Sequence, residues 1–129
     1  MATILVVDDE RPVREFLAEI LQEAGRQVLQ AAHGREALAV LQVEQPELII
    51  ADIMMPILGG VELCRRVKAD PGASAIPVIL MSSTVKPPAD LGGAEAFVHK
   101  PSGLGGIDKL VRRWLEPSTD AENPTSRLR

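Results

Sequence analysis

The sequence contains four short apolar runs, and each run is followed by residues with functional side chains. The runs and their followers are 4–7 with Asp8 and Asp9, 48–51 with Asp52, 78–81 with Ser82, and 96–98 with Lys100 and Pro101 shortly after. Runs that are apolar without alternation are typical of parallel strands covered on both faces. If the runs lie in one sheet, their followers meet at its carboxyl edge, where open α/β sheets bind ligands. Carboxylates, an ammonium and a hydroxyl there predict a site for a hard cation and an anion such as phosphate.

Strands and amphipathic helices are expected to alternate along the chain. We expect strands at 3–7, 27–31, 48–51, 77–81 and 95–98, and helices at 12–24, 35–44, 61–69 and 104–116. This order predicts an α/β fold, a doubly wound five-stranded parallel sheet of the flavodoxin-like (βα)5 type. Segment 83–93 contains two prolines and two glycines, which oppose a regular helix. The fourth helix is therefore expected to be shortened or missing.

Length and composition limit the chain to one domain of ordinary globular type. The chain has 129 residues, of which 46% are hydrophobic and only 2% aromatic, so the core must be aliphatic. We expect a domain over 1–116 and a disordered tail over 117–129, which has almost no apolar side chains. The net charge of −4 and the lack of a basic patch argue against nucleic acid as a partner.

Cysteine usage and hydropathy predict a cytoplasmic location. Cys64 is the only cysteine, so no intrachain disulfide can form, and a lone thiol suits a reducing compartment. We find no signal peptide. No apolar run approaches the roughly 18 residues of a membrane span.

The motifs together resemble those of the receiver domains of two-component response regulators. They are the acidic pair Asp8-Asp9, the run Asp52-Ile53-Met54-Met55-Pro56 followed by Gly59-Gly60, the strand-end Ser82, and Phe97 followed by Lys100-Pro101. Each motif alone is weak, but all of them occur in order and at strand ends. The resemblance covers residues 3–116.

The resemblance implies a role for each of these residues. Asp52 would accept a phosphoryl group from a phosphohistidine on a histidine kinase or phosphotransfer protein. Mg²⁺ would be bound directly by Asp9, Asp52 and the backbone carbonyl of Met54, and by Asp8 mainly through water. Ser82 would hydrogen-bond a phosphoryl oxygen, and Lys100 would pair with a second phosphoryl oxygen. Phe97 would rotate inward as part of a switch.

Elementary electrostatics supports these roles. Three clustered carboxylates repel one another, so without a metal some of their pKa values should rise. A divalent cation removes this repulsion and leaves Asp52 ionised for attack on phosphorus. A carboxylate nucleophile that forms an acyl phosphate is established covalent chemistry.

Other interpretations remain open from the sequence. Asp8 and Asp9 could serve only to cap the following helix, and Asp52 could be a turn residue. The chain could also be an interaction module that signals without phosphorylation, because the interval from Ser82 to Lys100 is about one helical turn shorter than the family pattern. A phosphatase with an aspartyl nucleophile is disfavoured, because Met54 stands where a second acid is expected.

Our leading prediction is a single-domain response regulator. It would be no enzyme beyond promoting its own phosphorylation and dephosphorylation, and it would change its affinity for a downstream protein target in trans. The sequence leaves the choice between monomer and homodimer open.

Overall fold

The computed structural model describes residues 2–83, 86–100 and 102–115. The predicted tail, the end of the last helix at residue 116 and Pro101 lie outside these residues. In chain order, the elements are β1 (Thr3–Val7), α1 (Arg11–Glu23), β2 (Gln27–Ala31), α2 (Gly34–Leu41), β3 (Leu48–Asp52), α3 (Gly60–Ala69), β4 (Val78–Ser82), β5 (Ala96–His99), a 3₁₀ helix (Ser102–Gly106) and α4 (Ile107–Leu115).

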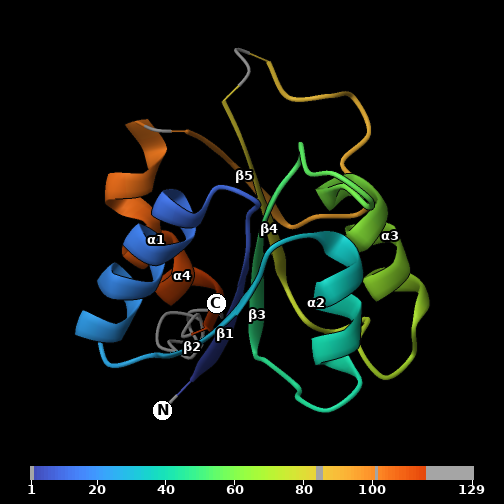
Figure 1. Ribbon diagram of the computed structural model, residues 1–129, viewed down its shortest axis with the longest axis horizontal. Helices are drawn as coiled ribbons and strands as arrows, with labels where there is room; N and C mark the ends of the chain where they lie inside the picture. The colour runs from blue at the N-terminus through green and yellow to red at the C-terminus, as the bar shows by residue number, and fades with distance from the viewer. Residues whose placement is uncertain (1, 84–85, 101, 116–129) are drawn as a thin grey trace, which may run out of the picture.

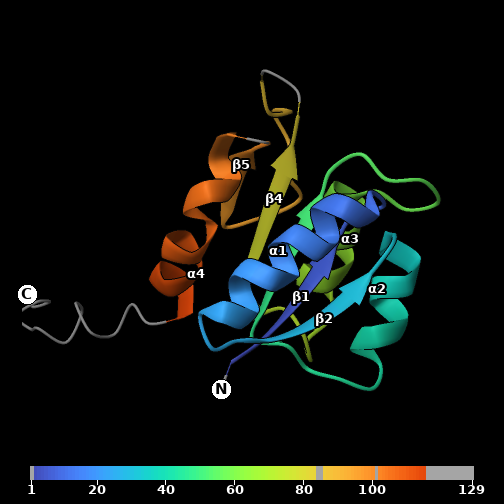
Figure 2. The same cartoon turned by 60° about the vertical axis from the view of Figure 1, so that its left-hand side comes forward.

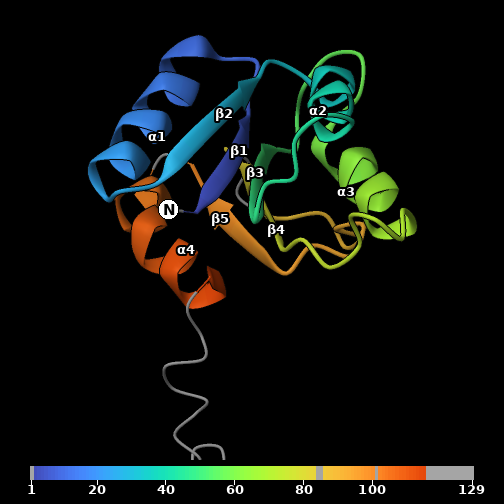
Figure 3. The same cartoon turned by 90° about the horizontal axis from the view of Figure 1, so that it is seen from below.

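The five strands form one parallel sheet in the order β2-β1-β3-β4-β5 (Figure 2). Helices α1 and α4 cover one face, and α2 and α3 cover the other (Figures 1 and 3). The predicted fold class, a doubly wound flavodoxin-like sheet, is confirmed. Among the described residues, no helix is long and apolar enough to cross a membrane.

Side chains of the central strands alternate between two aliphatic cores, one on each face of the sheet. In β1, Leu5 and Val7 enter the core beneath α2 and α3, whereas Ile4 and Val6 enter the core beneath α1 and α4. All four side chains are fully buried. Burial on both faces explains why these strands are uninterrupted apolar runs in the sequence.

Most predicted helix ends agree with the structure to within one residue, but two helices differ by three residues at one end. Helix α2 ends at Leu41 rather than at residue 44, because the chain turns at Gln42 and Val43, ahead of Pro46 and the start of β3 at Leu48. The last helix was predicted from residue 104, but its α-helical part begins at Ile107. Gly105 and Gly106 disfavour an α-helix, and this stretch forms a 3₁₀ helix instead.

The predicted shortening of the fourth helix is confirmed. Among the described residues between β4 and β5 there is no helix at all. The chain instead packs on α3, where Arg65 donates to Asp90 at 2.6 Å. Gly92 lies so close that a Cβ atom there would sit 2.5 Å from the carbonyl oxygen of Val61. Ion pairs and close backbone contact therefore replace the helix on this side of the sheet.

Candidate phosphoacceptor site

The strand register brings the predicted site residues to one edge of the sheet. Val7 pairs with Ala51, so Asp8 and Asp52 stand level at the ends of β1 and β3. Ser82 is the last residue of β4 and pairs with His99, which places Lys100 one residue beyond. The backbone N–H of Lys100 donates to the Ser82 carbonyl at 2.8 Å. Chain segments about 90 residues apart in sequence thus meet because they follow neighbouring parallel strands.

Lys100 is the centre of this cluster. Its Nζ atom lies 3.1 Å from Asp8 Oδ2, 3.2 Å from Asp52 Oδ2 and 3.2 Å from Glu10 Oε1. Asp8 is fully buried, Asp52 is 5% exposed and Lys100 is 7% exposed, whereas Glu10 reaches in from the surface. Buried charges of this kind persist in proteins only when they are paired or bind a cation.

The three carboxylates share one ammonium, and the pKa values of the two buried ones, Asp8 and Asp52, reflect this imbalance. Burial raises the pKa of Asp8. Burial and the neighbouring charge of Asp8 raise the pKa of Asp52. Burial alone would lower the pKa of Lys100, but the charge of Asp52 and the hydrogen bond to Asp8 outweigh it, so the pKa of Lys100 is raised. One lysine cannot neutralise three acids, and the site therefore favours a further cation.

Asp8 also shapes the turn that leads into α1. Its Oδ1 atom accepts the Glu10 N–H at 2.8 Å, and its carbonyl accepts Arg14 Nη1 at 2.7 Å. The N-cap of α1 is Glu10, which makes no side-chain cap. Asp8 thus stabilises the turn before the helix with one carboxylate oxygen while the other faces Lys100. It is not the N-cap of α1, which the capping interpretation would require.

The carboxylate oxygens of Asp8, Glu10 and Asp52 lie within 4.8 Å of one another. Clustered carboxylate oxygens are the donors that a hard cation such as Mg²⁺ prefers. Glu10 was absent from our sequence prediction, because an acid just before a helix looks like any exposed residue. Asp9, which we predicted as a direct ligand, is exposed and lies outside this trio. Its role as a ligand stays a prediction.

The loop after Asp52 is shaped by close backbone contacts. The Asp52 Oδ1 atom accepts the Met54 N–H at 3.4 Å. A Cβ atom at Gly60 would overlap the Asp52 carbonyl oxygen, so only glycine fits where α3 begins. Ile57 has a φ of 72°, a left-handed conformation that a β-branched residue rarely adopts. Met54 and Ile57 are 68% and 69% exposed, which leaves an apolar rim beside the acceptor.

The two remaining predicted residues lie near the cluster. Ser82 is buried at the end of β4, beside Asp52 in the register through Met81. Phe97 is half-buried in β5, pairs with Leu80 and packs on the core beneath α2 and α3. The structure therefore brings Asp8, Asp52, Lys100 and Ser82 to one edge of the sheet, with Phe97 two residues before its end.

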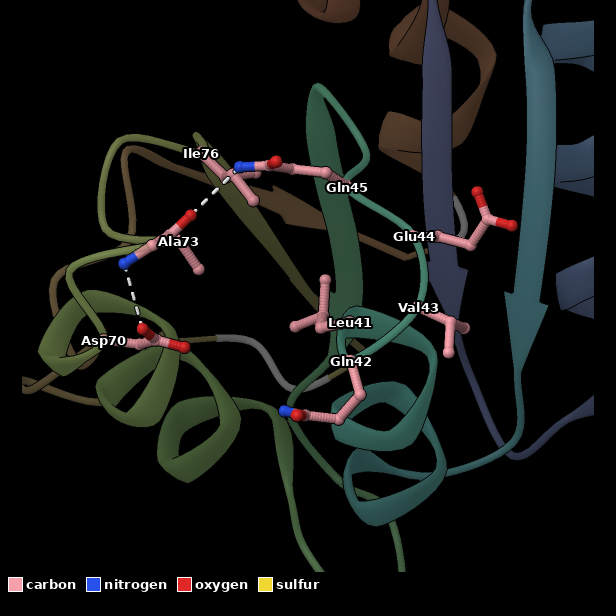
Figure 4. A pocket seen from close by; sticks show the side chains of 9 residues that line it. Leu41, Gln42, Val43, Glu44, Gln45, Asp70, Ala73 and Ile76 are labelled. Carbon is pink, nitrogen blue, oxygen red and sulfur yellow. Dashed lines mark hydrogen bonds between the residues drawn. The ribbon is translucent and has the colours of Figure 1, made fainter.

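A separate cavity of about 320 Å³ lies at the opposite edge of the sheet (Figure 4). Its walls are the end of α2 and the turn before β4, in which Ala73 donates to the Asp70 carbonyl at 2.9 Å. The chain segments that line it precede β3 and β4, whereas the charged cluster follows β1 and β3. This cavity is therefore distinct from the candidate site.

Comparisons with known proteins agree with this geometry. The family model of the response regulator receiver domain matches residues 4–112. The chain is 38% identical over 129 residues to the phosphate regulon transcriptional regulatory protein PhoB of Pseudomonas aeruginosa, covering 95% of this chain and 56% of PhoB. It is 36% identical over 119 residues to protein PilH of the same organism, covering 89% of this chain and 98% of PilH. The chain thus spans about half or less of several curated relatives and nearly all of PilH.

Solved structures give the same result. The signal receiver domain of a histidine kinase from Syntrophus aciditrophicus superimposes with a TM-score of 0.83 at 36% identity, covering 91% of this chain and 92% of that one. The response regulator TrrA from Thermotoga maritima, solved in complex with Mg²⁺ and BeF, gives a TM-score of 0.81 at 32% identity, covering 89% and 100%. Fold, strand-end residues and both comparisons agree, and this chain belongs to the response regulator receiver domain family.

Proposed function

We propose that this chain is a phosphorylation switch in which Asp52 accepts a phosphoryl group. The observation that carries the proposal is the buried Asp52 carboxylate, held at 3.2 Å by Lys100 in a cluster with Asp8 and Glu10. Such a cluster is costly for folding, because like charges are crowded where water is excluded. This cost in folding free energy is expected if the function of the site is to bind a cation and an anionic substrate.

The donor set fits Mg²⁺, which takes hard oxygen ligands and keeps several waters. Asp52, Asp8 and Asp9, with the Met54 carbonyl, would hold it, and Glu10 is a further carboxylate within reach. When bound, the ion supplies positive charge that leaves Asp52 ionised and offsets charge on the phosphoryl oxygens. The relative TrrA, which was solved with Mg²⁺ and BeF, supports this choice.

The phosphodonor would be a phosphohistidine of a histidine kinase or phosphotransfer protein. An oxygen of Asp52 attacks the phosphorus, the bond from phosphorus to the histidine nitrogen breaks, and that nitrogen keeps the electron pair. The product is an acyl phosphate on Asp52 and an unphosphorylated histidine on the donor. Lys100 then pairs with a phosphoryl oxygen as a point charge, and the Ser82 hydroxyl donates to another.

The output would be a change in affinity for a downstream protein. Movement of Ser82 toward the phosphoryl group would open space into which the half-buried ring of Phe97 turns. Phe97 has no hydroxyl, so burial alone would stabilise the inward position. The chain would act in the cytoplasm and would be no enzyme beyond its own phosphorylation and dephosphorylation.

The test is the intact mass of the protein after incubation with acetyl phosphate, with and without Mg²⁺. We expect one added phosphoryl group that requires Mg²⁺, is absent in Asp52→Asn and persists in the control Asp70→Asn, since Asp70 lies at the opposite edge of the sheet. No adduct under conditions where Mg²⁺ binds would favour the alternative, a phosphorylation-independent interaction module. The missing helix between β4 and β5 is the observation that favours this alternative.

A further inference from the structure

A groove opens between the two residues that follow Asp52 and the end of β4. It has a volume of about 280 Å³ and is lined by Ile53, Met54, Ser82, Lys86 and Pro88. One wall is the loop that follows Asp52, and the other is the segment that follows β4. Among the described residues that line it, Lys86 is the only cation.

The two oxygens of Asp52 face different surroundings. Oδ2 contacts Lys100 at 3.2 Å, whereas Oδ1 accepts the Met54 N–H at 3.4 Å. Met54 is itself part of the groove wall. A phosphoryl group carried on Oδ1 would therefore lie on the Met54 side of Asp52, toward the groove that Met54 and Lys86 both line.

The residues that follow Lys86 limit its conformation. Pro87 restricts the Lys86 backbone to extended conformations, and Pro88 continues the stiff run. Farther along, Asp90 contacts Arg65 of α3 at 2.6 Å. These restraints favour a position of Lys86 at the groove that it lines.

We propose that Lys86 is a second phosphoryl-binding cation, supplied by the segment that replaces the missing helix. The inference rests on the proposed function and extends it. A phosphoryl group brings a charge of about −2 to a site that already holds several carboxylates. Lys100 is shared among Asp8, Glu10 and Asp52, so a further ammonium on the groove side would stabilise the phosphorylated state.

The test measures binding of beryllofluoride, a stable tetrahedral analogue of the phosphoryl group, in the presence of Mg²⁺. We expect Lys86→Gln to weaken this binding about tenfold, as loss of one charge-assisted hydrogen bond does. Lys86→Arg should keep most of the affinity, because Arg retains the charge. Lys109→Gln is the matched control, since Lys109 is exposed on α4 on the other face of the sheet. Thermal melting of each variant checks that the fold is intact.

Salt separates direct contact from long-range attraction. A contact at the groove should leave most of the Lys86→Gln effect in place at high ionic strength, whereas attraction through solvent is screened beyond about 10 Å at 0.1 M salt. Equal affinities for Lys86→Gln and Lys109→Gln, or a loss that disappears at high salt, would overturn the assignment of Lys86. If the wild-type protein neither binds beryllofluoride nor forms an Asp52 adduct, the proposed function itself fails and takes this inference with it.

Discussion

The ammonium of Lys100 lies 3.2 Å from Asp52 Oδ2, and the backbone N–H of Lys100 donates to the carbonyl of Ser82 at 2.8 Å. The backbone hydrogen bond holds Lys100 in the position from which its side chain contacts Asp52. Because β3, β4 and β5 are adjacent in the sheet, the lysine is placed by main-chain pairing and not by its own flexible side chain. Asp52 and its counter-charge are therefore pre-organised by the fold.

Removal of this counter-charge should destabilise the fold. We expect Lys100→Met to lower the free energy of unfolding by about 3 kcal/mol at neutral pH, because it leaves buried carboxylates without a partner. The loss should be smaller at acidic pH, where protonation of Asp8 and Asp52 relieves their repulsion. Urea unfolding without metal measures this, with Lys109→Met as the exposed control, expected to change stability by at most about 0.5 kcal/mol. Equal losses at acidic and neutral pH would contradict this explanation.

The metal-free protein should lose stability as pH rises above the ordinary Asp range. The pKa values of Asp8 and Asp52 are raised in the folded state from 3.8, so above 3.8 these two carboxyls bind more protons in the folded protein than in the unfolded chain. Their contribution to the free energy of unfolding must then fall with rising pH, and we expect it to outweigh the opposite contributions of the exposed Glu62 and Asp90, whose pKa values are lowered. Urea unfolding in a chelator at several pH values should show this fall, reduced in Asp52→Asn. A rise in stability across the same window in the wild type would refute it.

Mg²⁺ should stabilise the fold, and single variants should identify its ligands. At a concentration ten times its Kd, a ligand that binds only the folded state adds about 1.4 kcal/mol. We expect the resulting rise in Tm to vanish in Asp52→Asn. Comparison of Asp9→Asn with Glu10→Gln then decides which neighbour of Asp8 binds the ion. Our prediction of Asp9 as a direct ligand requires the larger loss of Mg²⁺ affinity in Asp9→Asn, and the reverse order would transfer that role to Glu10.

The protein should be more stable with glycine at position 57 than with alanine there. The φ of 72° at Ile57 costs an L-residue roughly 1–2 kcal/mol, and glycine avoids this cost. We expect Ile57→Gly to exceed Ile57→Ala in the free energy of unfolding by about 1 kcal/mol. The same pair of substitutions at exposed Val43, which lies outside the positive-φ residues, should show the opposite order. Identical ordering at both positions would mean that strain at Ile57 is negligible.

Cys64 should be inert in the folded protein. The side chain is fully buried in the core beneath α2 and α3, and burial raises the pKa of its thiol to about 11. The thiolate is the reactive form, so reaction with a disulfide reagent at pH 8 should be slow until the protein is unfolded by urea. Rapid stoichiometric labelling of the native protein would show that α3 opens readily.

The sequence by itself determined the sheet and the principal site residues. Asp8, Asp52, Ser82 and Lys100 were recognisable because each follows an uninterrupted apolar run, and parallel strands buried on both faces admit only one edge at which such followers can meet. The absence of a regular fourth helix was likewise readable in the prolines and glycines of segment 83–93. Both inferences rest on local chemistry, which the order of residues carries directly.

Only the tertiary structure determined which charged groups contact one another and which residues line the same groove. Glu10 is an ordinary surface acid in the sequence and becomes a partner of Lys100 because the turn at Asp8 directs it inward. Lys86 lies in a segment that the sequence marks only as irregular, and the fold places it in the lining of one groove with Met54 and Ser82. The left-handed Ile57 is equally invisible, because the loop between β3 and α3 imposes it against the preference of the residue. These three features depend on how the loops pack against the rest of the fold, and no local pattern of residues records them.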